Sequence, residues 1–143
     1  MLVKEVMNRN VKTARSTDTV KDAAKIMTEN RIGSLVVVSG TGEVIGIVTE
    51  RDIMSKVVAF GRNADEVKIE EIMSKNIITI SPNNTLEDAA NIMTSKKIKK
   101  LPVVEDGGLI GIVTATDLIS YEKELIGKIS TILTSSPLKN IGG

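Results

Sequence analysis

The sequence repeats itself, and this repetition constrains the fold more than any other feature. When the 143-residue chain is shifted by about 66 residues, Glu5-Val6-Met7 aligns with Glu71-Ile72-Met73. Further along, and after a one-residue deletion, residues 45–49 align with residues 110–114, both reading Ile-Gly-Ile-Val-Thr. We therefore predict a tandem duplication, with repeat 1 at residues 1–61, a polar linker at 62–65 and repeat 2 at 66–124.

Hydrophobic periodicity predicts the same order of elements in both repeats, β-α-β-β-α. Thr19 and Thr85 are suitable N-caps for the first helix of each repeat. Each is followed by apolar residues at i, i+3, i+4 and i+7, namely Val20, Ala23, Ala24 and Met27 in repeat 1 and Leu86, Ala89, Ala90 and Met93 in repeat 2. The predicted strands are residues 11–13, 35–38 and 44–48 in repeat 1 and residues 77–80, 101–104 and 109–113 in repeat 2. A second helix is expected to begin near Thr49 and near Thr114.

This order predicts an α/β (α+β) fold. A small sheet with helices on one face leaves its other apolar face uncovered, and the second copy can cover it. We therefore expect two pseudo-twofold-related repeats packed through their sheets. Residues 125–143 are expected to form a helix to about Thr134 and then a flexible tail, because apolar residues recur there at helical spacing. They are Leu125, Ile126, Ile129, Ile132 and Leu133.

Composition favours a binding module over an enzyme. The chain has no Cys and no His, which excludes thiol nucleophiles, Cys-rich zinc sites and the Ser-His-Asp triad. We expect no catalytic residue and no metal site. The net charge is +1 and the aromatic residues are only Phe60 and Tyr121, so nucleic-acid binding is not favoured. The apolar runs are too short for a membrane helix and the N-terminus does not resemble a signal peptide, so we expect a cytoplasmic protein with no membrane partner.

The most informative local motif is Gly-Ile-Val-Thr-x-x-Asp, which begins at Gly46 and again at Gly111. One interpretation is structural: Thr at an N-cap and Asp at N3 form a capping box. The other is functional: where a strand ends and a helix begins, a Thr hydroxyl and helix amides can hold a phosphate, and a carboxylate can accept ribose hydroxyls. The residues alone leave both interpretations open.

At these motifs the chain resembles a tandem pair of CBS (cystathionine-β-synthase) domains. The resemblance rests on the opening Glu5-Val6-Met7 and Glu71-Ile72-Met73, the strand Leu101-Pro102-Val103-Val104 and the repeated Gly-Ile-Val-Thr-x-x-Asp motif, and it covers nearly all of residues 1–121. It implies a regulatory module without catalysis, whose cleft binds AMP, ADP, ATP or sometimes S-adenosylmethionine. As a hypothesis of our own, we expect that occupancy is read by a regulated partner chain and that the module forms a homodimer.

The resemblance implies a ligand site at each end of the cleft, completed in each case by the other repeat. The Asp residues would hold ribose and the Thr residues would contact phosphate. The first site comprises Asp117, Thr114, Ile112, Lys99, Lys100, Met7, Asn10, Lys12 and Ile32. The second site comprises Asp52, Thr49, Ile47, Arg51, Met73, Asn76, Ile78 and Ile98. For each Met or Ile taken singly, an ordinary core position is the favoured interpretation.

The two repeats differ just before the Leu of the second strand. Repeat 2 has Lys99 and Lys100 there, whereas repeat 1 has Gly33 and Ser34. Lysines can neutralise a phosphate chain, and a solvated basic face is an equally open interpretation. We therefore predict that the Asp117 site is the stronger nucleotide site, with Arg51 compensating in part at the other site.

Two other functions stay open at this point. In the first, the protein is a dimerisation scaffold without ligand, and its Thr/Asp pairs act only as helix caps. In the second, it hydrolyses nucleotides, which needs a positioned base or metal cluster that neither repeat offers. A measurement of ligand binding would distinguish the dimerisation scaffold from a nucleotide sensor.

Overall fold

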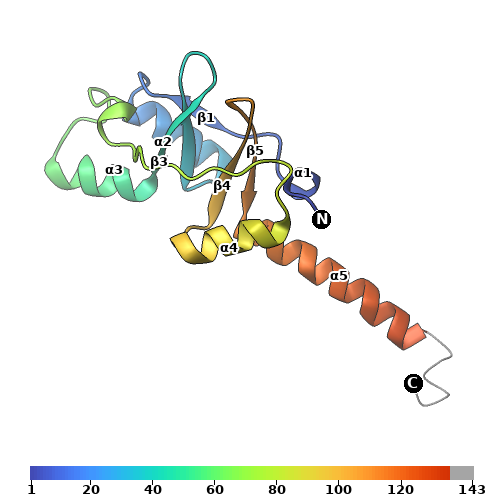
Figure 1. The fold of residues 1–143 in the computed structure, drawn as a ribbon. Coiled ribbons are helices and arrows are strands. Elements are labelled where there is room, and N and C mark those ends of the chain that lie inside the picture. The colour runs from blue at the N-terminus through green and yellow to red at the C-terminus, as the bar shows by residue number, and fades with distance from the viewer. Residues whose placement is uncertain (136–143) are drawn as a thin grey trace.

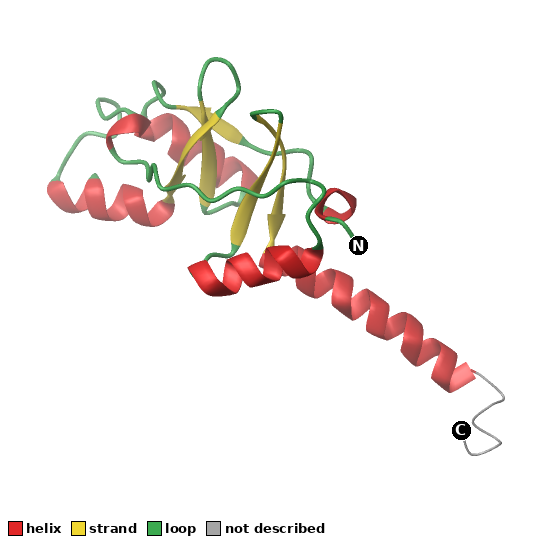
Figure 2. Cartoon of the chain, in the orientation of Figure 1, coloured by secondary structure: helices red, strands yellow, loops and turns green. Residues whose placement is uncertain are grey.

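The computed structural model of the protein describes residues 1–135, which form two small sheets flanked by helices (Figures 1 and 2). The first sheet has the order β1-β2-β3 and the second pairs β4 with β5. The strands are β1 (Thr13–Arg15), β2 (Ser34–Val38), β3 (Val44–Thr49), β4 (Lys100–Glu105) and β5 (Gly108–Thr114). The helices are α1 (Val3–Val6), α2 (Val20–Asn30), α3 (Glu50–Lys56), α4 (Leu86–Lys96) and α5 (Ala115–Ser135), with short 3-10 turns η1 (Val58–Phe60) and η2 (Ile69–Glu71). The predicted α/β class is confirmed.

The hairpin of each repeat has the same register. Leu35 pairs with Val48 in β2 and β3, and Leu101 pairs with Val113 in β4 and β5. All four side chains are at most 1% exposed. The predicted antiparallel hairpins are therefore confirmed, and each contributes its apolar face to the core.

One predicted strand is wrong. Residues 77–80 do not form a strand, and only Ile80 makes an isolated parallel bridge, to Val103. The equivalent β1 of repeat 1 pairs with β2 over three residues. The cause is Pro102 in β4. Its carbonyl accepts a hydrogen bond from the Ile80 N–H at 3.0 Å. Proline has no N–H, so it cannot donate a second hydrogen bond from the same side of β4. The predicted strand at 11–13 is displaced to Thr13–Arg15.

The first helix of each repeat begins as predicted, at a capping box. The Thr19 hydroxyl accepts from the Asp22 N–H at 3.2 Å, and the Asp22 carboxylate accepts from the Thr19 N–H at 3.1 Å. Thr85 and Asp88 form the same pair of bonds at 3.0 and 2.9 Å. Two otherwise unpaired backbone groups are satisfied at each helix start, which fixes where α2 and α4 begin.

The opening segment of each repeat packs on the other repeat. Val3 and Met7 belong to the core formed mainly by repeat 2, and Val67, Ile69 and Ile72 belong to the core formed mainly by repeat 1. Val3 and Ile69 are 0% exposed. The two units in space therefore differ from the two repeats in sequence, because the opening segments are exchanged.

Two glycines make this exchange possible. Asn8 exchanges two backbone hydrogen bonds, each 2.9 Å long, with Ile112, and Ser74 makes an equivalent pair with Ile47. Gly111 directly precedes Ile112, and Gly46 directly precedes Ile47. A Cβ atom added to Gly111 would be 2.6 Å from the Met7 sulfur, and one added to Gly46 would be 2.6 Å from the Met73 sulfur. Each crossing segment thus approaches its strand so closely that no side chain fits beneath it.

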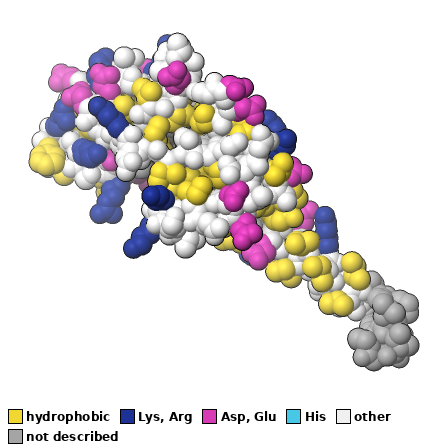
Figure 3. All heavy atoms as spheres, in the orientation of Figure 1, with side chains coloured by type: hydrophobic (Ala, Val, Ile, Leu, Met, Phe, Trp, Pro, Cys, Tyr) yellow, Lys and Arg dark blue, Asp and Glu magenta, His cyan; other side chains and the backbone are white. Residues whose placement is uncertain are grey.

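Helix α5 extends away from the rest of the molecule (Figure 1). It is continuous from Ala115 to Ser135, so the second helix of repeat 2 and the segment after residue 124 form one rod. Apolar side chains lie along this projecting part (Figure 3) and are 44–67% exposed; they are Leu125, Ile126, Ile129, Ile132 and Leu133. The predicted tail after the helix lies outside the described residues.

Acid is expected to weaken the fold through the carboxylates that cap helices. The pKa of Asp88 lies below its ordinary value of 3.8, first because the Thr85 N–H donates to the carboxylate and then because the Asn84 side chain does. The pKa of Asp22 is lowered in the same way by Thr19. A lowered pKa means that the folded protein binds the proton less readily than the unfolded chain, so this stabilisation is complete above the ordinary pKa and is lost as the pH falls through the lower, folded value.

We therefore expect the urea midpoint of Asp88→Asn to fall less steeply than that of the wild type between about pH 5 and pH 2. A Glu122→Gln control makes the same charge change on exposed α5 and should keep the wild-type slope. Identical pH profiles for Asp88→Asn and the wild type would show that the cap contributes nothing to acid sensitivity.

Candidate functional site

Each repeat places its Thr/Asp pair where a strand ends and a helix begins. The Thr49 N–H donates to Asp52 Oδ2 at 2.9 Å, and the Asp52 N–H donates to Thr49 Oγ1 at 3.1 Å. Thr114 and Asp117 make the same two bonds at 2.9 and 3.2 Å. One oxygen of each carboxylate is therefore engaged in a capping box at the start of α3 or α5, as the structural interpretation of the motif predicts.

The second oxygen distinguishes the two carboxylates. Asp52 Oδ1 forms an ion pair with Lys56 Nζ at 3.2 Å, and this ammonium also donates to the Ile72 carbonyl at 2.8 Å. Repeat 2 has Tyr121 at the position of Lys56, and Asp117 Oδ1 makes no hydrogen bond or ion pair with any residue between 1 and 135. Asp117 thus keeps an oxygen for an external hydroxyl, whereas Asp52 is already paired.

A cleft of about 850 Å³ lies between the two repeats. It is bounded by the start of β2, the end of β3, the start of β4 and Ile112 of β5. Several predicted site residues from both repeats line it together: Ile47, Thr49, Arg51, Ile98, Lys99, Lys100 and Ile112. The arrangement offers apolar surface for a planar base next to cationic side chains for an anion.

Other predicted residues do not line this cleft. Met7 and Met73 lie over Gly111 and Gly46, where they complete the exchanged packing. Ile78 packs against the core of repeat 2. Asn10, Lys12 and Asn76 are exposed and lie outside the lining, as do the side chains of Thr114, Asp52 and Asp117.

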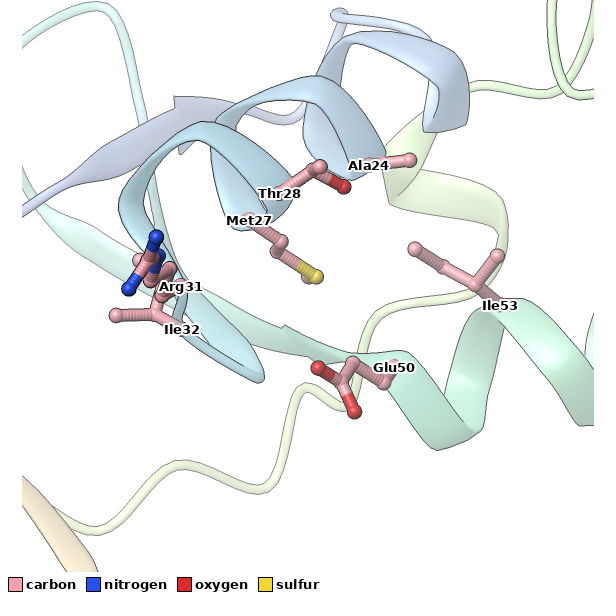
Figure 4. A pocket seen from close by; sticks show the side chains of 7 residues that line it. All are labelled: Ala24, Met27, Thr28, Arg31, Ile32, Glu50 and Ile53. Atoms are coloured by element: carbon pink, nitrogen blue, oxygen red, sulfur yellow. The ribbon is translucent and has the colours of Figure 1, made fainter.

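Ile32 lines a separate pocket of about 440 Å³ between α2 and α3 (Figure 4). This pocket has an apolar wall formed by Met27, Ile32 and Ile53, with Arg31 and Glu50 at its edge. All of its lining comes from repeat 1, so it cannot report on how the two repeats sit relative to each other.

The structure adds six residues to the predicted set. They line the cleft together with the predicted ones and are Gly33, Ser34, Leu35, Val36, Lys97 and Pro102. Ser34 is tied to repeat 2, because its hydroxyl accepts a hydrogen bond from Lys100 Nζ at 3.0 Å. The pseudo-symmetry of the two strands offered a signal for this contact, since Ser34 and Lys100 occupy equivalent positions in the two repeats.

Two absences within residues 1–135 bear on the kind of site. In that range there is no group of three or more His, Cys, Asp or Glu side chains able to hold a metal ion. Nor does the range contain a helix of the length and apolar character needed to cross a bilayer.

Comparison with known proteins gives consistent matches. A family model described as CBS domain matches residues 3–59 and 69–124. An uncharacterised protein of Methanopyrus kandleri is 44% identical over 128 residues, covering 89% of this chain and 65% of its own length, so this chain spans slightly under two thirds of that relative. The CBS domain-containing protein YhcV of Bacillus subtilis is 33% identical, with 97% of this chain and 94% of its own length covered.

A solved structure resembles most of the chain. It is a CBS domain pair crystallised in complex with 5′-methylthioadenosine and S-adenosyl-L-methionine. It superposes with a TM-score of 0.76 and 33% identity, covering 87% of this chain and 97% of that chain.

Proposed function

Because the chain belongs to the CBS domain family and carries two CBS domains in tandem, we propose that it is a non-catalytic regulatory module that binds an adenosine-containing ligand. AMP, ADP and ATP are the proposed ligands, with S-adenosylmethionine as a further one. The observation that carries this proposal is the cleft between the repeats, where apolar side chains adjoin four cationic ones. The neighbouring CBS pair that holds two adenosine derivatives supports the same ligand class.

Each part of such a ligand has a proposed partner. Asp117 Oδ1 accepts a hydrogen bond from a ribose hydroxyl, because this oxygen is not used within residues 1–135. Lys99 and Lys100 neutralise phosphate. Ile98 and Ile112 offer apolar surface to the adenine ring.

We propose that the Asp117 end of the cleft binds the nucleotide more strongly than the Asp52 end. Asp52 Oδ1 already forms an ion pair with Lys56. A ribose hydroxyl would have to displace Lys56 from this oxygen, which costs free energy. In addition, repeat 1 has Gly33 and Ser34 where repeat 2 has two lysines. Both differences favour the same end.

Calorimetric titration of Asp117→Ala tests this proposal. Loss of a carboxylate that accepts hydrogen bonds from the ligand is expected to weaken nucleotide binding by roughly 10- to 100-fold, since hydrogen bonds to charged groups contribute about 1.5–3 kcal/mol. Asp88→Ala is the matched control, because it removes an equivalent capping box at the start of α4, which belongs to neither predicted ligand site. It should leave binding unchanged. Binding that survives Asp117→Ala but is abolished by Asp52→Ala would reverse the proposed ranking.

A ligand-free scaffold is the second candidate, favoured by the four capping-box bonds that Thr49, Asp52, Thr114 and Asp117 make. Thermal unfolding in the presence of ligand separates the two functions. At 100 times its dissociation constant, a ligand adds about 2.7 kcal/mol of stability. Absence of any shift with AMP, ADP, ATP or S-adenosylmethionine would leave the scaffold as the function.

In the proposed function, the occupied cleft changes how the two repeats sit relative to each other, and another chain responds to the change. The available free energy is the difference in ligand affinity between the two arrangements. Formation of a homodimer and the existence of a separate regulated protein stay predictions, and sedimentation with and without nucleotide would test the first.

A further inference from the structure

All ionisable side chains that line the cleft are cations. They are Arg51, Lys97, Lys99 and Lys100, and they are called the cationic cluster below. No Asp or Glu of residues 1–135 is part of the lining, although the Glu50 carboxylate lies next to Gly33 and the whole chain carries a net charge of only +1. The cleft is therefore a local concentration of positive charge on a nearly neutral protein.

No member of the cationic cluster forms an ion pair within residues 1–135. The ion pairs in this range join Lys21 to Asp65, Lys56 to Asp52, Arg62 to Glu71 and Lys128 to Glu124. None of them involves a member of the cluster. Four unpaired cations around one hollow repel one another, and an anionic ligand with several charges relieves that repulsion.

Lys100 brings positive charge to both halves of the cleft. It belongs to repeat 2, but its ammonium donates to the Ser34 hydroxyl of repeat 1 at 3.0 Å. Lys97 and Lys99 belong to repeat 2, and Arg51 belongs to repeat 1. The cluster therefore spans the cleft, and a phosphate chain lying across it can meet cations from both repeats.

We propose that the cleft selects nucleoside polyphosphates, with ATP bound more tightly than ADP, ADP more tightly than AMP, and S-adenosylmethionine bound least. This inference rests on the proposed function and adds a charge preference to it. Each added phosphate brings one more negative charge, whereas S-adenosylmethionine carries a cationic sulfonium that the cluster repels. Because these charge-assisted contacts are partly exposed, each added phosphate is expected to raise the binding affinity roughly 5- to 20-fold.

Calorimetry with ATP, ADP, AMP, adenosine, S-adenosylmethionine and inorganic tripolyphosphate tests the preference. The double variant Lys99→Met/Lys100→Met should lose roughly 20-fold or more in ATP affinity while its affinity for adenosine is unchanged. Lys96→Met is the matched control, because this exposed lysine is nearby in sequence but does not line the cleft. The single variant Lys99→Met, at an exposed position, keeps the test valid if the double variant fails to fold.

The outcomes separate this inference from the proposed function. Equal affinities for ATP and AMP, or an ATP-to-AMP ratio that the double variant does not change, would overturn the polyphosphate preference and leave adenosine binding intact. If inorganic tripolyphosphate binds as tightly as ATP, the adenosine moiety contributes nothing to affinity, and the proposed function itself would be overturned. Tightest binding by S-adenosylmethionine would overturn the charge preference alone.

Discussion

Replacing Ile69 by alanine is expected to lower the free energy of unfolding by about 2–5 kcal/mol. Ile69 lies in the opening segment of repeat 2, yet its side chain is 0% exposed in the core formed mainly by repeat 1. Truncation leaves a cavity and also weakens the attachment of one repeat to the other. Urea unfolding at neutral pH measures the change.

Ile126→Ala is the control for this prediction. Ile126 lies on the projecting part of α5 and is 59% exposed, so its truncation should change the stability of the monomer by no more than about 0.5 kcal/mol. If Ile69→Ala behaves like Ile126→Ala, residues 67–72 do not pack in the core of repeat 1 and the exchanged arrangement is incorrect.

Gly111→Ala is expected to cost about 1–3 kcal/mol, although glycine-to-alanine changes in strands are often stabilising. The new Cβ atom would be 2.6 Å from the Met7 sulfur and 3.1 Å from the Asn8 carbonyl oxygen. The methionine side chain can move aside, but the carbonyl belongs to the backbone segment that pairs with Ile112. The substitution therefore pushes the N-terminal segment away from β5.

Gly40→Ala provides the comparison, because an added Cβ atom there has no neighbour within 4 Å. It should be nearly neutral. A double-mutant cycle of Gly111→Ala with Met7→Ala should show coupling of at least 0.5 kcal/mol, since the two changes act on one contact. Additive effects would show that the methionine does not lie over this glycine in solution.

Local features of the fold were predictable because local chemistry determines them. The helix starts follow from Thr19 and Thr85, each with an Asp three residues later. The hairpins follow from alternating apolar runs separated by Gly-containing turns. The predicted strand at residues 77–80 was wrong because its partner contains Pro102, so the pairing depended on a residue distant in sequence.

The exchange of opening segments was not predictable from these patterns. Val67, Ile69 and Val3 are apolar wherever they pack, and nothing in their spacing indicates which core receives them. Gly46 and Gly111 are visible in the repeated motif, but the close approach of Met73 and Met7 appears only in three dimensions.

The candidate site, too, has features that were predictable from sequence and features that were not. The repeated Thr and Asp, and the lysines of repeat 2, were identified from sequence, and several of them line one cleft or lie next to it. The pairing of Asp52 with Lys56 and the contact between Lys100 and Ser34 depend on side-chain conformation. Only the first of these contacts makes the two carboxylates chemically different, because Asp117 has no equivalent partner within residues 1–135.

The crossed opening segments also bear on how such a chain could have originated. With the geometry seen here, a solitary ancestral unit could fill its core only by domain swapping, since residues equivalent to 1–8 reach the neighbouring unit. Gene fusion of two such units would turn an association that depends on concentration into one that is always satisfied within a single molecule.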